Sequence, residues 1–295
     1  MKKQYKLILL AVAALGVIGI GTLAVVFISS HNLAVLNPKG TIADQQLQLM
    51  ITTAWLMAII VVPVLALTFG IAWRYRAGNK KAKYSPDLAG NKWAETIWWL
   101  IPFAIIAVLA VIAWTSSHAL DPYKPLVSNR KPLEVQVIAL QWKWLFIYPK
   151  QHIATINYLQ LPKDTPINFT ITSDAPMNSF WIPQLGGQVY AMTGMSTRLH
   201  LMASQNGDYR GQSANISGEG FAGMKFTTHV SDETDFEKWI DSVQGSAGAE
   251  LTPQKYDELT KPTKDVPPAH YIFPVSSDDL YDTVVMKYMT PGEHH

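Results

Sequence analysis

The sequence contains no cysteine at any of its 295 positions. This absence excludes disulfide bonds, thiolate metal sites and thiol nucleophiles. It also excludes a lipoprotein signal, which needs a cysteine to carry the lipid. The absence does not identify a compartment, because a domain outside the cytoplasm can fold without disulfide staples.

Charge is also scarce in this chain. Charged residues make up 16% of the sequence, with a formal net charge of +2, whereas an ordinary globular domain carries roughly 25%. No basic stripe is present to neutralise phosphates, so no nucleic-acid partner is predicted. Apolar residues are concentrated before position 117, and the remainder has the composition of an ordinary soluble domain.

Long apolar runs occupy residues 7–29, 47–73 and 96–114. Each is close to the ~20 residues that a helix needs to cross a membrane. The first run follows a lysine-rich start. It exceeds the ~7–15 residues of a signal-peptide core and lacks a good cleavage site, which favours a retained anchor over a cleaved signal. The runs predict an N-terminal signal or anchor helix over residues 1–30 and a transmembrane helical hairpin over residues 31–120.

The loop between the second and third runs sets the predicted orientation. Its basic residues outnumber its single acid, Asp87, and this bias places a loop in the cytoplasm. The basic residues are Arg74, Arg76, Lys80, Lys81, Lys83 and Lys92. Everything after about Ser117 is therefore expected on the outer side of the membrane.

The remaining sequence predicts an all-β domain over residues 121–232 and a helical tail over residues 233–295. Apolar and polar residues alternate from position 133, as in a half-buried strand, and short strands at such spacing are typical of a sandwich or barrel. In the tail, Thr252 followed by Pro253 resembles a helix start. The expected strands are 133–137, 155–159, 167–172, 188–192, 197–202 and 225–230, and the expected helices are 233–243, 252–259 and 278–289.

Motifs for catalysis are missing. The chain has no phosphate loop, nucleophile elbow or metalloprotease helix. Its eight histidines are scattered, without the spacing of a closed metal site. No catalytic residue is therefore predicted.

Three segments of the outer domain nevertheless carry a resemblance. They are residues 141–148 (QWKWLFIY), 174–183 (DAPMNSFWIP) and 211–224 (GQSANISGEGFAGM). Together they resemble subunit II of the haem–copper oxidases, in which a membrane helical hairpin carries a cupredoxin-like β-barrel. Further motifs at residues 37–40, 73–77 and 83–86 are similar to the cytochrome bo-type quinol oxidase branch.

Copper-bearing members of that family hold a dinuclear copper centre, CuA. Its ligands are an early His and the motif Cys-x-Glu-x-Cys-x-x-x-His-x-x-Met, because thiolates, imidazoles and a thioether suit soft copper. In this sequence the corresponding positions are Asn178, Ser213, Asn215, Ser217, Phe221 and Met224. Only Met224 keeps the ligand type, and a single thioether is a weak ligand, so we expect Met224 to fill the core.

The resemblance implies a subunit of a proton-pumping terminal quinol oxidase that lacks CuA and acts as a scaffold. It implies no metal or cofactor in this chain, because the haems and remaining copper belong to the catalytic subunit I. The implied partners are subunit I, smaller membrane subunits, membrane lipid and the quinol pool, without cytochrome c. The implied location is the bacterial inner (plasma) membrane, multi-pass, with the C-terminal domain in the periplasm. The alternative is a free-standing, membrane-tethered cupredoxin-like binding or assembly protein.

Glu95 is the one carboxylate to which the resemblance gives a role. The family often has Glu at the start of the third helix, at the mouth of a proton path into the catalytic subunit. An acid there is also favoured by the helix dipole, by ~0.3–1 kcal/mol, and both readings can hold. Trp142 and Trp144 are expected to pack against the catalytic subunit. Asp174, Arg198 and Glu219 are candidates for contact with partner subunits, between which the sequence does not decide.

Overall fold

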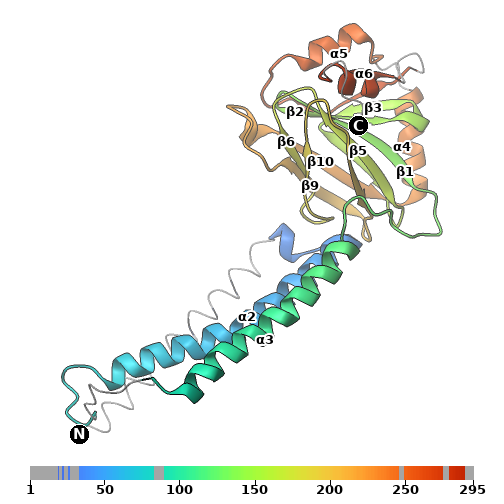
Figure 1. Ribbon diagram of the computed structural model, residues 1–295. Helices are drawn as coiled ribbons and strands as arrows, with labels where there is room; N and C mark the ends of the chain where they lie inside the picture. Colours follow the sequence, from blue (N-terminus) through green and yellow to red (C-terminus); the bar gives the residue numbers. More distant parts are fainter. Residues whose placement is uncertain are drawn as a thin grey trace.

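A computed structural model describes residues 33–82, 90–245, 249–274 and 279–289, with the isolated positions Gly19, Thr22 and Val26. The predicted helix over residues 7–29 otherwise lies outside the described residues. Part of the basic loop, residues 83–89, lies outside them too. The described chain forms a long helical hairpin joined to a β domain (Figure 1).

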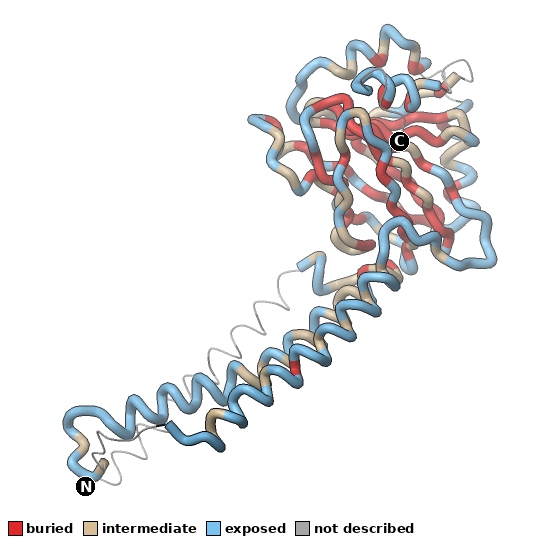
Figure 2. The backbone as a smooth tube through the Cα atoms, in the orientation of Figure 1, coloured by how far each residue is buried: buried red, intermediate tan, exposed pale blue. Residues whose placement is uncertain are grey.

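The hairpin consists of α2 (Thr41–Arg74) and α3 (Lys92–Ala119), preceded by a short 3-10 helix, η1 (Ala34–Leu36). With mean hydropathies of 2.4 and 2.5, α2 and α3 are long and apolar enough to cross a membrane. Their surfaces are almost wholly exposed, and Ala43 and Ile105 are their buried residues (Figure 2). Exposed apolar side chains on this scale need lipid or other subunits around them.

The β domain contains two sheets that face each other. One has the order β11-β3-β2-β1-β5-β8, and the other has the order β4-β10-β9-β6-β7. The pairs β1–β5 and β4–β10 are parallel, and the other named pairs are antiparallel. The strands are β1 (Leu133–Leu140), β2 (Lys143–Tyr148), β3 (Ile153–Ile156), β4 (Tyr158–Pro162), β5 (Ile167–Ser173), β6 (Asn178–Trp181), β7 (Val189–Ala191), β8 (Thr197–Leu201), β9 (Gly207–Ser213), β10 (Lys225–Ser231) and β11 (Ala269–Ile272). Two further 3-10 turns are η2 (Pro149–Gln151) and η3 (Phe221–Gly223).

The single strand predicted over residues 155–159 is wrong. The backbone turns at Asn157, whose φ is 53°, a conformation that Asn tolerates better than most residues. The Asn157 side chain holds this corner by accepting from the Trp144 N–H at 2.8 Å and donating to the Val266 carbonyl at 2.8 Å. The chain thereby passes from β3 in one sheet to β4 in the other.

An aromatic core fills the space between the sheets. Trp144, Phe146, Phe180 and Phe226 are buried there, and the rings of Phe180 and Phe226 stack at 5.3 Å. A Cβ on Gly211 would lie 2.0 Å from the Phe226 ring, so this strand position needs glycine. Burying each such ring stabilises the fold by about 1.5–3 kcal/mol.

A second apolar core lies on the outer face of the six-stranded sheet. The tail helices α4 (Glu233–Gly245), α5 (Pro253–Thr260) and α6 (Leu280–Met286) follow the barrel, and α5 and α6 cover this face (Figure 1). The sheet side chains Ile138 and Leu145 are buried against them. Thus β2 is buried on both faces, and its sequence shows no polar alternation.

The three predicted tail helices are present. Thr252 caps α5 by accepting from the Lys255 N–H at 3.2 Å, and Pro253 follows at the first helical position.

A buried lysine joins the barrel to the tail. Lys143 is 1% exposed, and its ammonium donates to the carbonyls of Leu259 at 2.7 Å and Lys261 at 2.8 Å. These carbonyls end α5, where a cation is favoured. Burial lowers the pKa of Lys143.

Asp174 makes the second polar connection to the tail. Its carboxylate accepts from the hydroxyl of Tyr256 at 2.7 Å, the ammonium of Lys287 at 2.8 Å and the hydroxyl of Tyr288 at 2.5 Å. The hydrogen bond to Asp174 raises the pKa of Lys287, and burial raises that of Tyr256. Asp174, a candidate for contact with a partner subunit, is thus buried and directs its carboxylate to the tail of its own chain.

The segment before α2 joins the hairpin to the barrel. Lys39 N–H donates to the Gln184 carbonyl at 2.7 Å, and Gly40 forms an isolated bridge with Ala203. A Cβ on Gly40 would lie 2.7 Å from the Met202 carbonyl oxygen, so a larger residue would force the two segments apart.

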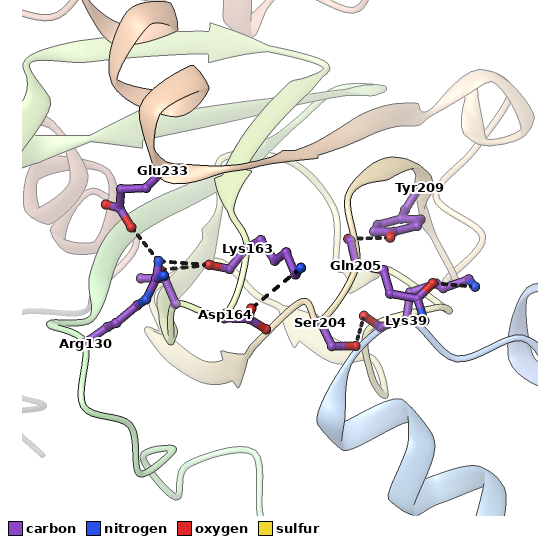
Figure 3. A network of polar contacts seen from close by, with 9 residues as sticks. Lys39, Arg130, Lys163, Asp164, Ser204, Gln205, Tyr209 and Glu233 are labelled. Carbon is purple, nitrogen blue, oxygen red and sulfur yellow. Dashed lines mark hydrogen bonds and ion pairs between the residues drawn. The ribbon is translucent and has the colours of Figure 1, made fainter.

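Side chains reinforce this joint (Figure 3). The Lys39 ammonium donates to the Gln205 side chain at 2.8 Å, and the Ser204 hydroxyl donates to the Lys39 carbonyl at 2.9 Å. Arg130 pairs with Glu233 at 2.7 Å nearby, linking the segment between α3 and β1 to the start of the tail. The hairpin and the barrel are thus bonded together where they meet.

Replacing Lys143 with Met should weaken the docking of the tail. The carbonyls at the end of α5 would lose their donor, at a cost of about 1–3 kcal/mol. We expect a lower thermal midpoint and faster proteolysis within residues 250–289 of the full chain in detergent. Lys150→Met is the matched control, because Lys150 is in an exposed pair with Glu134, worth about 0–1 kcal/mol. Equal midpoints for the two variants would contradict the role given to Lys143.

Acid should also weaken tail docking, through His270 of β11. Its ring packs against Tyr158 and Trp239. The residue as a whole remains exposed, and desolvation of the ring by these neighbours lowers its pKa below the ordinary 6.5. As pH falls through 6.5, the unfolded chain binds a proton that the folded chain resists, so stability falls. Thermal midpoints measured above and below this pH should show a smaller acid loss for His270→Phe than for the unchanged chain. An identical loss in both would rule out His270 as the cause.

Candidate functional site

The turn between β1 and β2 positions the loop that corresponds to the CuA motif. Trp142 occupies the turn with a φ of 64°, and its indole N–H donates to the Ser217 carbonyl at 3.1 Å. A Cβ on Gly220 would lie 2.2 Å from the indole ring, and Gly218 has a φ of +109°. The glycines of this loop therefore allow it to fold over Trp142.

The strand pairs bring three of the CuA-equivalent positions together. Because β6 pairs with β9, Asn178 lies beside Ser213, and the Ser213 hydroxyl donates to the Asn178 side-chain oxygen at 3.0 Å. The Ser213 N–H donates to the Met224 carbonyl at 3.2 Å. All three residues are buried, and Met224 packs in the aromatic core.

The other three positions lie on the loop between β9 and β10. The Asn215 amide donates to the Met177 carbonyl at 2.8 Å, which fastens the loop to the segment before β6. The Ser217 hydroxyl is buried without a hydrogen-bond partner among the residues that the structure describes, while its carbonyl accepts from the Trp142 indole N–H. Phe221 begins η3 and is half-buried.

The chemistry of this site is that of a closed polar loop. Its side chains are two amides, two hydroxyls, a phenyl ring and a thioether. The Ser213 hydroxyl and the Asn178 amide oxygen are bonded to each other, and the NH₂ groups of Asn178 and Asn215 donate to backbone carbonyls. Soft thioether and thiolate ligands select copper, and here the thioether stands alone. In the described ranges, no group of three or more His, Asp or Glu lies together as a metal site would require.

Trp144 does not lie where it was expected. It is fully buried among core rings, with Phe180 5.4 Å from its own ring, so it cannot pack against another subunit. The strand alternation inside β2 turns Trp144 inward, whereas Trp142 belongs to the turn and is only partly buried.

Glu95 lies in the first turn of α3. The Asn91 side chain caps this helix by accepting from the N–H groups of Trp93 and Ala94. A Cβ on Gly90 would lie 2.1 Å from a Glu95 carboxylate oxygen, so the carboxylate folds back over the helix start. It lines an open depression with Trp99, which is 75% exposed.

Sequence reasoning missed the polar residues that hold the tail. Lys143 had one available signal, because this lysine begins the strand KWLFIY, which is otherwise apolar on both faces. Asp174 gave no comparable signal, since its partners come from positions 256, 287 and 288.

Two family models match the chain. Residues 150–230 match the model described as cytochrome c oxidase subunit II, periplasmic domain. Residues 246–292 match the COX aromatic rich motif, which contains Tyr256 and Tyr288 of the tail. A solved structure, the periplasmic domain of subunit II of cytochrome oxidase of Bradyrhizobium japonicum, is similar over 40% of this chain and 96% of that domain. Its TM-score is 0.37 at 20% identity.

Curated relatives are similar over most of their length. The cytochrome bo(3) ubiquinol oxidase subunit 2 of Pseudomonas aeruginosa is 47% identical over 90% of this chain and 78% of the relative. The ubiquinol oxidase subunit 2 of Acetobacter aceti is 44% identical over 95% of this chain and 90% of the relative. The quinol oxidase subunit 2 of Bacillus cereus is 41% identical over 78% of this chain and 79% of the relative. On this similarity, together with the barrel and its closed loop, the chain belongs to the subunit 2 family of the cytochrome bo-type quinol oxidases.

Proposed function

We propose that this chain is subunit II of a terminal oxidase that passes electrons from quinol to oxygen and pumps protons. The observation that carries the proposal is the hydrogen bond from Ser213 to Asn178. It joins two positions that hold copper ligands in cytochrome c-oxidising relatives. A barrel closed in this way offers no copper site that could accept electrons from a soluble donor. A lipid-soluble quinol can instead deliver electrons within the membrane.

The chain acts in this complex as a scaffold, not as the catalyst. The haems and the remaining copper are assigned to the catalytic subunit I. The contribution of this chain is a rigid joint between hairpin and barrel, centred on Gly40, and a barrel stiffened by its tail. We infer that the barrel carries no redox group of its own.

The partners follow from the exposed surfaces of α2 and α3. Trp55, Phe103 and Trp114 are among the large apolar side chains exposed there, and we assign these surfaces to subunit I, smaller membrane subunits and lipid. The basic residues at and beyond the end of α2, including Arg74 and Arg76, support a cytoplasmic loop by the positive-inside rule. The barrel is then periplasmic, in a multi-pass protein of the bacterial inner membrane.

Co-purification separates this function from its rival. An affinity tag on this chain should recover a large haem-bearing membrane protein in equal amount, with quinol-dependent oxygen uptake. A free-standing binding or assembly protein built on the same barrel would purify without haem. Recovery of the chain alone from mild detergent, with the oxidase activity left behind, would favour that rival.

Restoring the lost ligands should restore copper binding. We expect the quadruple variant with Cys at positions 213 and 217 and His at positions 178 and 221 to bind copper, because Met224 is already in place. The measurement is copper per chain, together with the visible absorption of a copper–thiolate centre. The double variant with only the two histidines is the control and should lack this absorption. A quadruple variant that folds but takes up no copper would contradict the ligand assignment.

Glu95 is proposed as the mouth of a proton path into the catalytic subunit. Its carboxylate is half-buried at the start of α3 and faces the open depression that another subunit can cover. Carboxylates at the membrane boundary are functional candidates.

Replacing Glu95 with Gln should slow turnover, because the amide cannot carry a proton. We expect quinol-dependent oxygen uptake to fall about 10²-fold, which is the usual effect of losing a positioned acid or base. Glu95→Asp should recover part of the rate, and Asp44→Asn, an exposed acid at the other end of the hairpin, should leave it unchanged. Unchanged turnover in an assembled Glu95→Gln complex would remove Glu95 from the path.

A further inference from the structure

A cavity of about 230 Å³ lies where the hairpin meets the barrel. Its walls come from the first turns of α2, the end of α3, the linker of residues 120–132 that joins α3 to β1, and two barrel segments. The lining includes Gln46, Leu120, Asp121, Lys124, Gln188 and His200. Its volume is below the ~300–1,000 Å³ of pockets for whole drug-sized ligands, so it suits a small polar group whose remainder stays outside.

The cavity lies at the level of lipid head groups. Gln46 directly precedes the apolar run that begins at residue 47, so it marks the edge of the hydrocarbon. Ala119, which also lines the cavity, lies five residues beyond the end of the run at residues 96–114, or about 7.5 Å along a helix. The head-group layer on each side of a bilayer is about 5–8 Å thick. The cavity therefore opens into this layer.

The polar groups of the cavity carry both signs of charge. Lys124 and Asp121 lie in one turn of the linker, where the Lys124 N–H donates to the Asp121 carbonyl at 3.0 Å. One Asp121 carboxylate oxygen accepts from the Tyr123 N–H at 2.9 Å. Within the described part of the chain, the Lys124 ammonium and the amides of Gln46 and Gln188 make no hydrogen bond or ion pair.

The remaining walls are fixed or apolar. His200 is nearly buried, and its ring nitrogen Nδ1 bonds to the Pro122 carbonyl at 2.8 Å, which holds the linker against β8. Leu120 and Leu126 line the cavity beside Val127, which is 99% exposed. An apolar residue so exposed at this level suits contact with the glycerol and upper acyl region of a lipid.

We propose that this cavity binds the head group of a zwitterionic phospholipid with a primary ammonium, as in phosphatidylethanolamine. Lys124 and the two glutamine amides donate to the phosphate, and Asp121 accepts from the ammonium. This pairing uses the free donors and the free carboxylate oxygen together. A purely anionic head group would leave Asp121 facing negative charge, and a trimethylated ammonium offers Asp121 no N–H. The proposal is independent of the proposed function.

The test captures lipid at this site in the whole complex. The photoreactive residue p-benzoylphenylalanine replaces Val127, whose exposed side chain tolerates it, and the complex is placed in nanodiscs of defined lipid. After irradiation, mass spectrometry counts lipid adducts on this chain. We expect adducts with phosphatidylethanolamine to exceed those with phosphatidylcholine and phosphatidylglycerol when the three are mixed equally.

Charge variants then identify the contacts. Lys124→Met keeps the aliphatic stem and should reduce the phosphatidylethanolamine adduct about tenfold, the size expected for one charge-assisted hydrogen bond. Asp121→Asn keeps the turn and should abolish the preference over phosphatidylglycerol. Lys131→Met, an exposed residue of the same linker, should change nothing. Equal capture of all three lipids, or adducts indifferent to Lys124→Met, would overturn the proposal.

Discussion

The burial of β2 and of the second half of β1 on both faces is the constraint on which the rest of the β domain depends. An antiparallel barrel strand usually keeps one face in water, but here Trp144 and Phe146 fill the barrel while Ile138 and Leu145 pack under the tail. Without the tail, this outer apolar face would be open. The tail is therefore part of the fold, and it even supplies β11 to the sheet.

The same strand pair explains how the CuA-equivalent loops keep their shape. Its turn presents Trp142 to the loop after β9, and Ser213 and Asn178 are bonded across β6 and β9. Hydrogen bonds and a tryptophan hold these loops, so the barrel keeps its shape with residues that are not copper ligands.

The sequence predicted features that depend on local periodicity. The apolar runs at residues 47–73 and 96–114 lie within α2 and α3, and Thr252 caps α5 as expected. The strands β2, β6, β9 and β11 were not predicted, because burial on both faces, short length or glycine removes the alternation of polar and apolar residues. The corner at Asn157 is held partly by a bond to the tail, and the hydrogen-bond partners of Asp174 also lie in the tail. No local sequence pattern predicts contacts between residues so far apart in the chain.

The candidate site was predictable only in part. Residue matching placed Asn178, Ser213 and Met224 at equivalent ligand positions, and strand pairing brings them together. Predicting that Trp144 points into the core would have required knowledge of the register of β2. Predicting the depression beside Glu95 would have required knowledge of which side chains meet at the start of α3. The cavity with Asp121 and Lys124 joins segments more than 70 residues apart, such as α2 and the linker.

If electrons reach this oxidase from quinol without passing through the barrel, a soluble donor should not drive it. Oxygen uptake by the purified complex is measured with a short-chain quinol and with reduced cytochrome c, alongside counts of copper and haem. We expect uptake with quinol alone and a single copper for every pair of haems. Uptake driven by cytochrome c, or additional copper with the spectrum of CuA, would contradict it.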